Sequence, residues 1–226
     1  MTKRLILLMS VLMLAVIGCG GGERATQGNS ESDEDRLNGS ATPEEAVMAI
    51  RDALLARDEE TFLASFHADE MNQQILRGMF TLSCAVSELN EKVTEAFGEG
   101  EAARILKQQK DPFDQFKAAT EEGLDISASQ DGYSALCKFT DSDADELMLT
   151  KMPDGWVGIV LSEEETMDEE TKRALKMFEA LTKALGEAGD AAAEEGMTVG
   201  KFEDILDAKL AGVYSAMLME TAGEGE

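Results

Sequence analysis

Three groups of residues in this 226-residue chain have the types and spacing that chemistry requires. Cys19 is a thiol that directly follows a run of apolar residues. His67, the chain's one histidine, stands two positions before Asp69, and an imidazole with a nearby carboxylate can act in acid–base catalysis. Residues 141–145 carry three alternating aspartates, and clustered carboxylates can bind a hard cation. Of the three groups, the surrounding sequence favours only Cys19 as a site.

Residues 1–18 have the organisation of an export signal. Lys3 and Arg4 form a basic start, and residues 5–17 are apolar apart from Ser10. A basic start, an apolar run of about 7–15 residues and a small residue before the cut are typical of a cleaved signal peptide. The run is too short for the ~20 apolar residues that span a bilayer comfortably. The alternative is an uncleaved signal anchor.

The end of this leader, Val16-Ile17-Gly18-Cys19, resembles the lipobox of bacterial lipoproteins. The resemblance implies cleavage before Cys19 and acylation of its thiol and new amine, with palmitate as a typical chain. In that family a glycine at the second mature position, here Gly20, is compatible with export to an outer membrane where one exists. We therefore expect a lipoprotein of the cell envelope, anchored in the membrane and facing the periplasm or the exterior.

The composition limits the partners of the mature chain. The full chain has 46 acidic and 20 basic residues, a net charge of −26, and losing Lys3 and Arg4 with the leader changes this to −28. Such a surface repels nucleic acid and anionic headgroups, so no nucleic-acid partner is expected. The expected partners are the membrane, through Cys19, and an unidentified protein or small apolar ligand.

The mature chain is expected to begin with a linker. Residues 19–41 comprise the cysteine for acylation and a stretch rich in Gly, Ser, Asn and acidic residues. A flexible coil of this length has a root-mean-square reach of about 25 Å. Order is expected from Thr42, where Thr42-Pro43-Glu44-Glu45 combines a hydroxyl cap, a proline at the first helical position and a glutamate three residues after the cap.

Helices are predicted on both sides of a strand region. A first helix begins at Thr42, Asp58 caps a second short one, and an unbroken apolar seam predicts a long helix over residues 70–97. The seam comprises Ile75, Met79, Leu82, Val86, Leu89, Val93 and Phe97. Residues 162–226 predict two further helices in an acidic C-terminal region.

Four short alternating segments between these helices predict an antiparallel meander, because tight-turn residues separate them. They are residues 124–128, 133–139, 147–150 and 156–161. The predicted fold class is therefore α+β: a β-meander of about four strands packed by N-terminal helices, with a long helix before the sheet and two C-terminal helices.

Two parts of the chain resemble nuclear-transport-factor-two-like domains, the cone-shaped fold shared with ketosteroid isomerase. The first comprises Thr42-Pro43-Glu44-Glu45-Ala46, Leu54-Leu55-Ala56-Arg57-Asp58 and the aromatic helix end Phe62–Phe66. The second is the closing hairpin, Asp154-Gly155-Trp156 followed by residues 157–160. The resemblance implies one α+β domain over residues 42–161, although a long helix over 70–97 departs from the family's pattern.

The same resemblance implies where a pocket would lie. The isomerase-like enzymes of this fold place Asp or His inside the cone, and here the candidates of suitable type are His67, Asp69, Tyr133 and Trp156. Their structural alternatives are a surface or helix-capping role for His67 and packing against a helix for the two aromatic residues. No catalytic residue of the family falls on a matching position, so none is assigned.

The sequence therefore favours a non-catalytic binding or interaction module over an enzyme. One alternative is a ketosteroid isomerase-like enzyme, or a binder of small apolar ligands, that uses the cone cavity. A second alternative is a helical scaffold or oligomer built on the long helices.

Two further cysteines, Cys84 and Cys137, leave a disulfide open as an alternative. Outside the cytoplasm such a pair can oxidise, and a bridge would close a loop of 137 − 84 = 53 residues. Closing that loop would contribute ~4 kcal/mol on the chain-entropy model. The other interpretation is two separate buried thiols.

No metal or cofactor is expected. Residues 141–145 have the spacing that begins an EF-hand loop, but Glu146 stands where that loop needs glycine and Met152 where it needs glutamate. An acidic, solvated hairpin loop is the preferred interpretation. The chain has no phosphate-binding loop, dinucleotide fingerprint or zinc motif.

Overall fold

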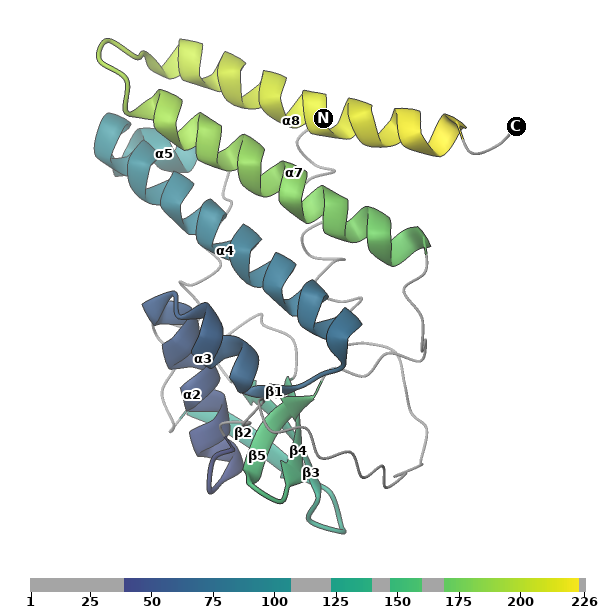
Figure 1. The fold of residues 1–226 in the computed structure, drawn as a ribbon. Helices are drawn as coiled ribbons and strands as arrows, with labels where there is room; N and C mark the ends of the chain where they lie inside the picture. Colours follow the sequence, from purple (N-terminus) through teal and green to yellow (C-terminus); the bar gives the residue numbers. More distant parts are fainter. Residues whose placement is uncertain (1–38, 107–122, 140–146, 160–168, 224–226) are drawn as a thin grey trace. The chain divides into compact units, whose positions relative to one another are not determined.

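The computed structural model describes residues 39–106, 123–139, 147–159 and 169–223, which fall into two compact units (Figure 1). The first unit contains the described parts of 1–73 and 115–165, and the second those of 74–114 and 166–226. The described residues form six helices and a five-stranded sheet, so the predicted α+β class is confirmed. The units cut across the continuous domain predicted over 42–161.

The first unit consists of two short helices and the sheet (Figure 1). Its elements are α2 (Pro43–Ala56), α3 (Glu59–Ala64), β1 (Phe66–His67), β2 (Leu124–Ala128), β3 (Ser134–Phe139), β4 (Leu147–Met152) and β5 (Gly155–Ile159). The strand order is β1-β5-β4-β3-β2, and β2 to β5 pair with their chain neighbours in antiparallel fashion, as the meander prediction requires.

Strand β1 was not predicted, and it makes the sheet mixed. The sequence indicates a helix end at Phe66 and His67, whereas the structure pairs them in parallel with Gly158 and Ile159 of β5. A two-residue strand is too short to show a period in the sequence. Its pairing is set by a partner more than 90 positions away.

The first helix forms where its start signals predict it. The Glu45 amide donates to Thr42 Oγ1 at 3.2 Å, and the Ala41 amide donates to Glu45 Oε2 at 3.0 Å. The first bond satisfies a donor that the first turn leaves open, and the second ties Glu45 back to the residue before the cap. The helix ends at Ala56, where Arg57 adopts the left-handed conformation with φ 55°.

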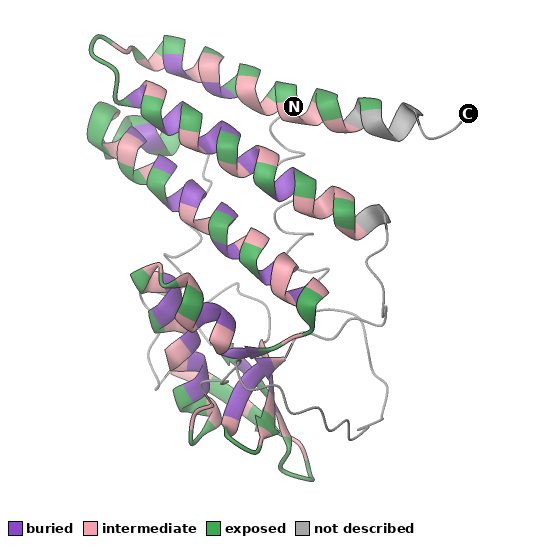
Figure 2. Cartoon of the chain, viewed as in Figure 1, coloured by how far each residue is buried: buried purple, intermediate pink, exposed green. Residues whose placement is uncertain are grey.

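Helix α2 packs against the sheet, and the core of the first unit lies between them. From α2 the buried residues are Ala46, Val47, Ile50, Ala53 and Leu54. The facing strands contribute Ala135, Cys137 and Leu149, all at most 2 % exposed. Leu136, which points the other way from β3, is 40 % exposed. Figure 2 shows β5 as a run of buried residues between its neighbours.

The second unit is helical. It contains most of α4 (Glu70–Phe97), with α5 (Glu99–Ile105), α7 (Glu169–Ala192) and α8 (Val199–Gly223). The predicted seam of α4 is confirmed from Leu82 to Val93 but displaced by one position near its start. There Leu76 and Phe80 are buried, whereas Ile75 and Met79 are half-buried.

Helices α4 and α7 run in parallel, side by side. Phe178 of α7 lies directly against Gly78 of α4, and one end of the pair is joined by Lys92, whose Nζ lies 2.7 Å from Asp190 Oδ1. That bond raises the pKa of Lys92. Helix α8 returns antiparallel along α7 and places Phe202, fully buried, 5.6 Å between ring centroids from Phe97.

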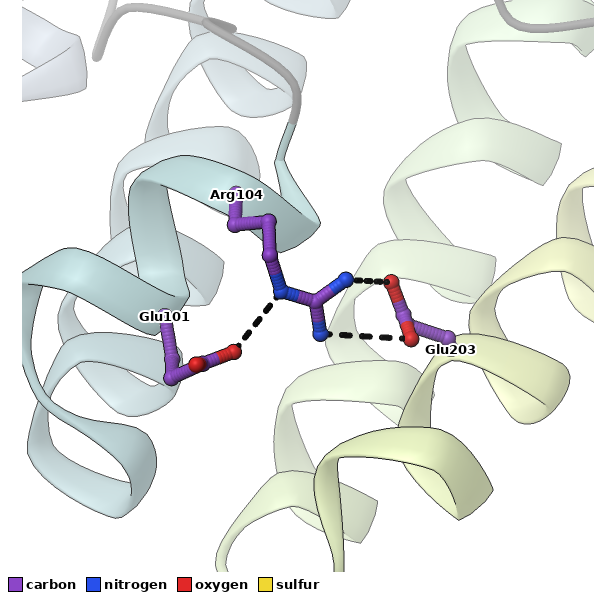
Figure 3. Close-up of polar contacts among 3 residues, drawn as sticks. All are labelled: Glu101, Arg104 and Glu203. Atoms are coloured by element: carbon purple, nitrogen blue, oxygen red, sulfur yellow. Dashed lines mark hydrogen bonds and ion pairs between the residues drawn. The ribbon is translucent and has the colours of Figure 1, made fainter.

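A second charged contact joins α5 to α8 (Figure 3). Arg104 places Nη1 3.1 Å and Nη2 3.4 Å from the two carboxylate oxygens of Glu203, and its Nε donates to Glu101 at 2.8 Å. The bonds to Glu101 and Glu203 raise the pKa of Arg104. One guanidinium thus bridges two carboxylates on neighbouring helices.

The packing of the first unit predicts which leucine on the sheet matters. Leu149→Ala should lower the free energy of unfolding by about 3 kcal/mol, because it leaves a cavity in the core beneath α2. Leu136→Ala is the matched control and should cost less than about 1 kcal/mol, because that side chain is already partly in water. Urea unfolding followed by the fluorescence of Trp156, the chain's one tryptophan, reports on this unit. Equal losses in the two variants would contradict the assignment of faces.

Candidate functional site

Two of the groups considered from the sequence lie outside the described residues. Cys19, the predicted lipidation site, precedes the first described residue, Gly39. The aspartates of residues 141–145 fall between β3 and β4, in a stretch that is also outside the described ranges. Both interpretations therefore stay predictions.

Asp69 caps a helix. Its Oδ1 accepts a hydrogen bond from the Asn72 amide at 2.8 Å, and its carbonyl oxygen accepts from the Gln73 amide at 2.8 Å. This is the arrangement of an N-cap residue, here of α4. His67 lies two positions earlier, in β1, and is exposed. Among the described residues it makes no hydrogen bond to the carboxylate of Asp69. The pair therefore lacks the contact that an oriented imidazole requires.

The two aromatic candidates lie in different surroundings. Tyr133 stands in the turn before β3 and is 65 % exposed, whereas Trp156 in β5 is 7 % exposed. Strand β4 separates them, since Lys151 pairs with Trp156 on one side and its amide donates to the Tyr133 carbonyl on the other. The strand predicted over residues 133–139 begins at Ser134, and the ring of Tyr133 is in solvent.

The sheet places His67 and Trp156 on opposite faces. Phe66 pairs with Gly158 and His67 with Ile159, and side chains alternate between faces along each strand. Trp156 and Gly158 therefore share a face with Phe66, and His67 points the other way. The four residues considered for a cone pocket do not converge in the first unit.

The remaining cysteines lie in different units. Cys84 is half-buried on α4, and Cys137 is buried on β3. The structure contains no disulfide between them. Burial raises the pKa of Cys137 to about 11, so at neutral pH it is a protonated, apolar side chain of the core.

The described residues offer no metal centre and no membrane span. Nowhere in the described ranges do three or more His, Cys, Asp or Glu side chains gather as a metal ion would need. Within the same ranges, no helix combines the length and apolar character that crossing a bilayer takes.

A contact that the sequence did not indicate lies where the predicted linker meets the fold. Ser40 forms an antiparallel bridge with Trp156: its amide donates to the Trp156 carbonyl at 3.0 Å, and the Trp156 amide donates back at 2.8 Å. We call Gly39, Ser40 and the β4–β5 turn at Asp154 and Gly155 the clasp. It seats the start of the described chain beside β5, on the same edge of that strand as β1.

The clasp depends on two glycines that face each other. A Cβ atom on Gly39 would meet the Asp154 carbonyl oxygen, and one on Gly155 would lie 2.5 Å from the Ser40 carbonyl oxygen. Gly155 also has φ +130°, a conformation that side chains disfavour. Gly39 lies in a stretch whose composition predicts a linker, so only the pairing with Trp156 reveals its role.

No protein-family model, curated protein or solved structure matches the chain significantly. The description of the clasp and of the other candidate residues therefore rests on this chain alone.

The capping role of Asp69 leads to a prediction. Asp69→Ala should lower the free energy of unfolding by about 1 kcal/mol, because the first turn of α4 loses its side-chain acceptor. Asp69→Asn is the matched control and should be nearly neutral, since an amide oxygen also caps. Urea midpoints followed by far-ultraviolet circular dichroism make the comparison. A loss as large in the Asn variant would show that the charge, and not the cap, is what α4 requires.

Proposed function

We propose that the protein is a lipid-anchored protein of the cell envelope, held to the membrane through Cys19, and that its folded units act as a non-catalytic binding or interaction module. The observation that carries the proposal is the leader: a basic start, an apolar run and Val16-Ile17-Gly18-Cys19. A signal peptide alone would release the chain, but acylation of both the thiol and the new amine supplies the two chains that stable anchoring takes.

The position of the clasp supports a linker between the anchor and the fold. Residues 20–38 separate Cys19 from Gly39, and a coil of that length reaches about 25 Å. A net charge of −28 on the mature chain keeps the folded part away from anionic headgroups and in solution. We further propose that the outer membrane is the destination where one exists, because Gly20 follows the cysteine.

The geometry of the first unit supports binding over catalysis. The carboxylate of Asp69 is engaged in capping, and His67 and Trp156 lie on opposite faces of the sheet. The face beneath α2 is filled by side chains such as Leu149, which is fully buried. The likeness to nuclear-transport-factor-two-like domains remains part of this proposal, and it is supported by the packing of α2 against an antiparallel meander.

Replacing the cysteine tests the anchor. Cys19→Ser should abolish the incorporation of a fatty-acid analogue in the native cells and leave the protein unprocessed, because the thioether can no longer form. Cys84→Ser is the matched control and should keep both the label and the processed mass, since it removes a thiol from the folded part only. Mass spectrometry of the amino terminus provides the second readout.

Two results would count against the proposal. An unmodified Met1 terminus on the mature protein would make the leader a signal anchor, and label retained in the Cys19→Ser variant would move acylation to another residue.

A further inference from the structure

We infer that the end of the first unit that carries the β4–β5 turn faces the lipid surface, because the anchored chain enters the fold at the clasp. The inference rests on the proposed anchor at Cys19 and goes beyond it by assigning which surface of the protein lies next to the membrane.

The clasp fixes the point at which the linker leaves the folded unit. Ser40 is held by two backbone hydrogen bonds to Trp156, at 3.0 and 2.8 Å. The facing glycines let the two backbones approach so closely that any side chain at Gly39 or Gly155 would collide with the opposite chain. Gly39 and Ser40 are therefore held beside the turn at Asp154, ahead of the first helix.

Distances within the first unit then separate a near end from a far end. Helix α2 starts directly after the clasp and has 14 residues, so it extends about 21 Å away from it. Glu60 lies just beyond the end of α2, in the first turn of α3, and is exposed. With a linker reach of about 25 Å, the clasp stays close to the headgroups on average and Glu60 lies farther out.

The charge of the near end shows what kind of contact this is. Glu44 in the first turn of α2, Asp131 in the β2–β3 turn and Asp154 in the β4–β5 turn are all exposed carboxylates at this end of the unit. Hydrogen bonds from the Ser129 hydroxyl and the Tyr133 amide lower the pKa of Asp131, which keeps it ionised. These carboxylates repel anionic headgroups, so the near end faces the membrane across a layer of water and does not insert into it.

Energy transfer from tryptophan to dansyl-labelled headgroups tests the inference on the full acylated protein in phosphatidylcholine vesicles. Trp156, the chain's one tryptophan, is the near donor. The far donor is Glu60→Trp combined with Trp156→Phe. Transfer from Trp156 should exceed transfer from position 60 by about twofold or more, because the far donor is displaced by roughly the length of α2. Matching circular dichroism of the two proteins verifies that both are folded.

Equal transfer from the two positions, with both proteins floating with the vesicles, would overturn the assignment of the near end and leave the anchor standing. Failure of the native protein to float with vesicles, with the Cys19→Ser variant behaving identically, would overturn the anchor and with it this inference.

The clasp itself is tested without a membrane by hydrogen exchange. Ser40→Pro removes the donor to the Trp156 carbonyl and should speed exchange of the Trp156 amide about tenfold or more, because both bonds of the bridge open. Ser40→Ala keeps the backbone donor and should leave the exchange rate unchanged. A Trp156 amide that exchanges equally fast in all three proteins would show that no clasp forms in solution, which would overturn the inference at its first step.

Discussion

Strand β5 holds the first unit together, because three separate parts of the chain pair with it. Strand β4 occupies one edge, while β1 and Ser40 share the other. The ring of Phe66 lies directly against Gly158, where a Cβ atom would be 2.5 Å from a ring carbon, so the parallel pairing of β1 requires glycine at that position. Ser40, strand β1 and the rest of the meander thus all pair with one five-residue strand. This explains why the central residues of β5 are all buried.

The second unit meets a different constraint, which is the excess of acidic residues. Apolar packing supplies its core, since Val93 and Phe202 are fully buried. Two of the scarce basic residues join neighbouring helices: Lys92 joins α4 to α7, and Arg104 joins α5 to α8. Both pairs are exposed to solvent, so they matter mainly by relieving repulsion where acidic helices meet. A helical body of this kind agrees with the alternative in which the long helices form a scaffold, and such a role stays a prediction.

The sequence predicts the elements whose signals are local, and not those that depend on distant partners. The cap at Thr42, the cap at Asp58 and the bounds of the long helix over 70–97 are confirmed, since each rests on residues within a few turns. Strand β1 and the Ser40 bridge were missed, because two-residue pairings have no period and lie in stretches that indicate a helix end and a linker. The pocket candidates came from residue type and a family resemblance, whereas the strand register places His67 and Trp156 on opposite faces of the sheet. Cys19 rests on a local pattern alone.

The position of the Ser40 bridge determines how mechanical tension would enter the protein. A pull on the amino-terminal segment is transmitted through two backbone hydrogen bonds to an interior strand, and from there to both of its neighbours. The bridge is isolated, so its two bonds are the first to bear such a load, and the tension reaches β5 only while they hold.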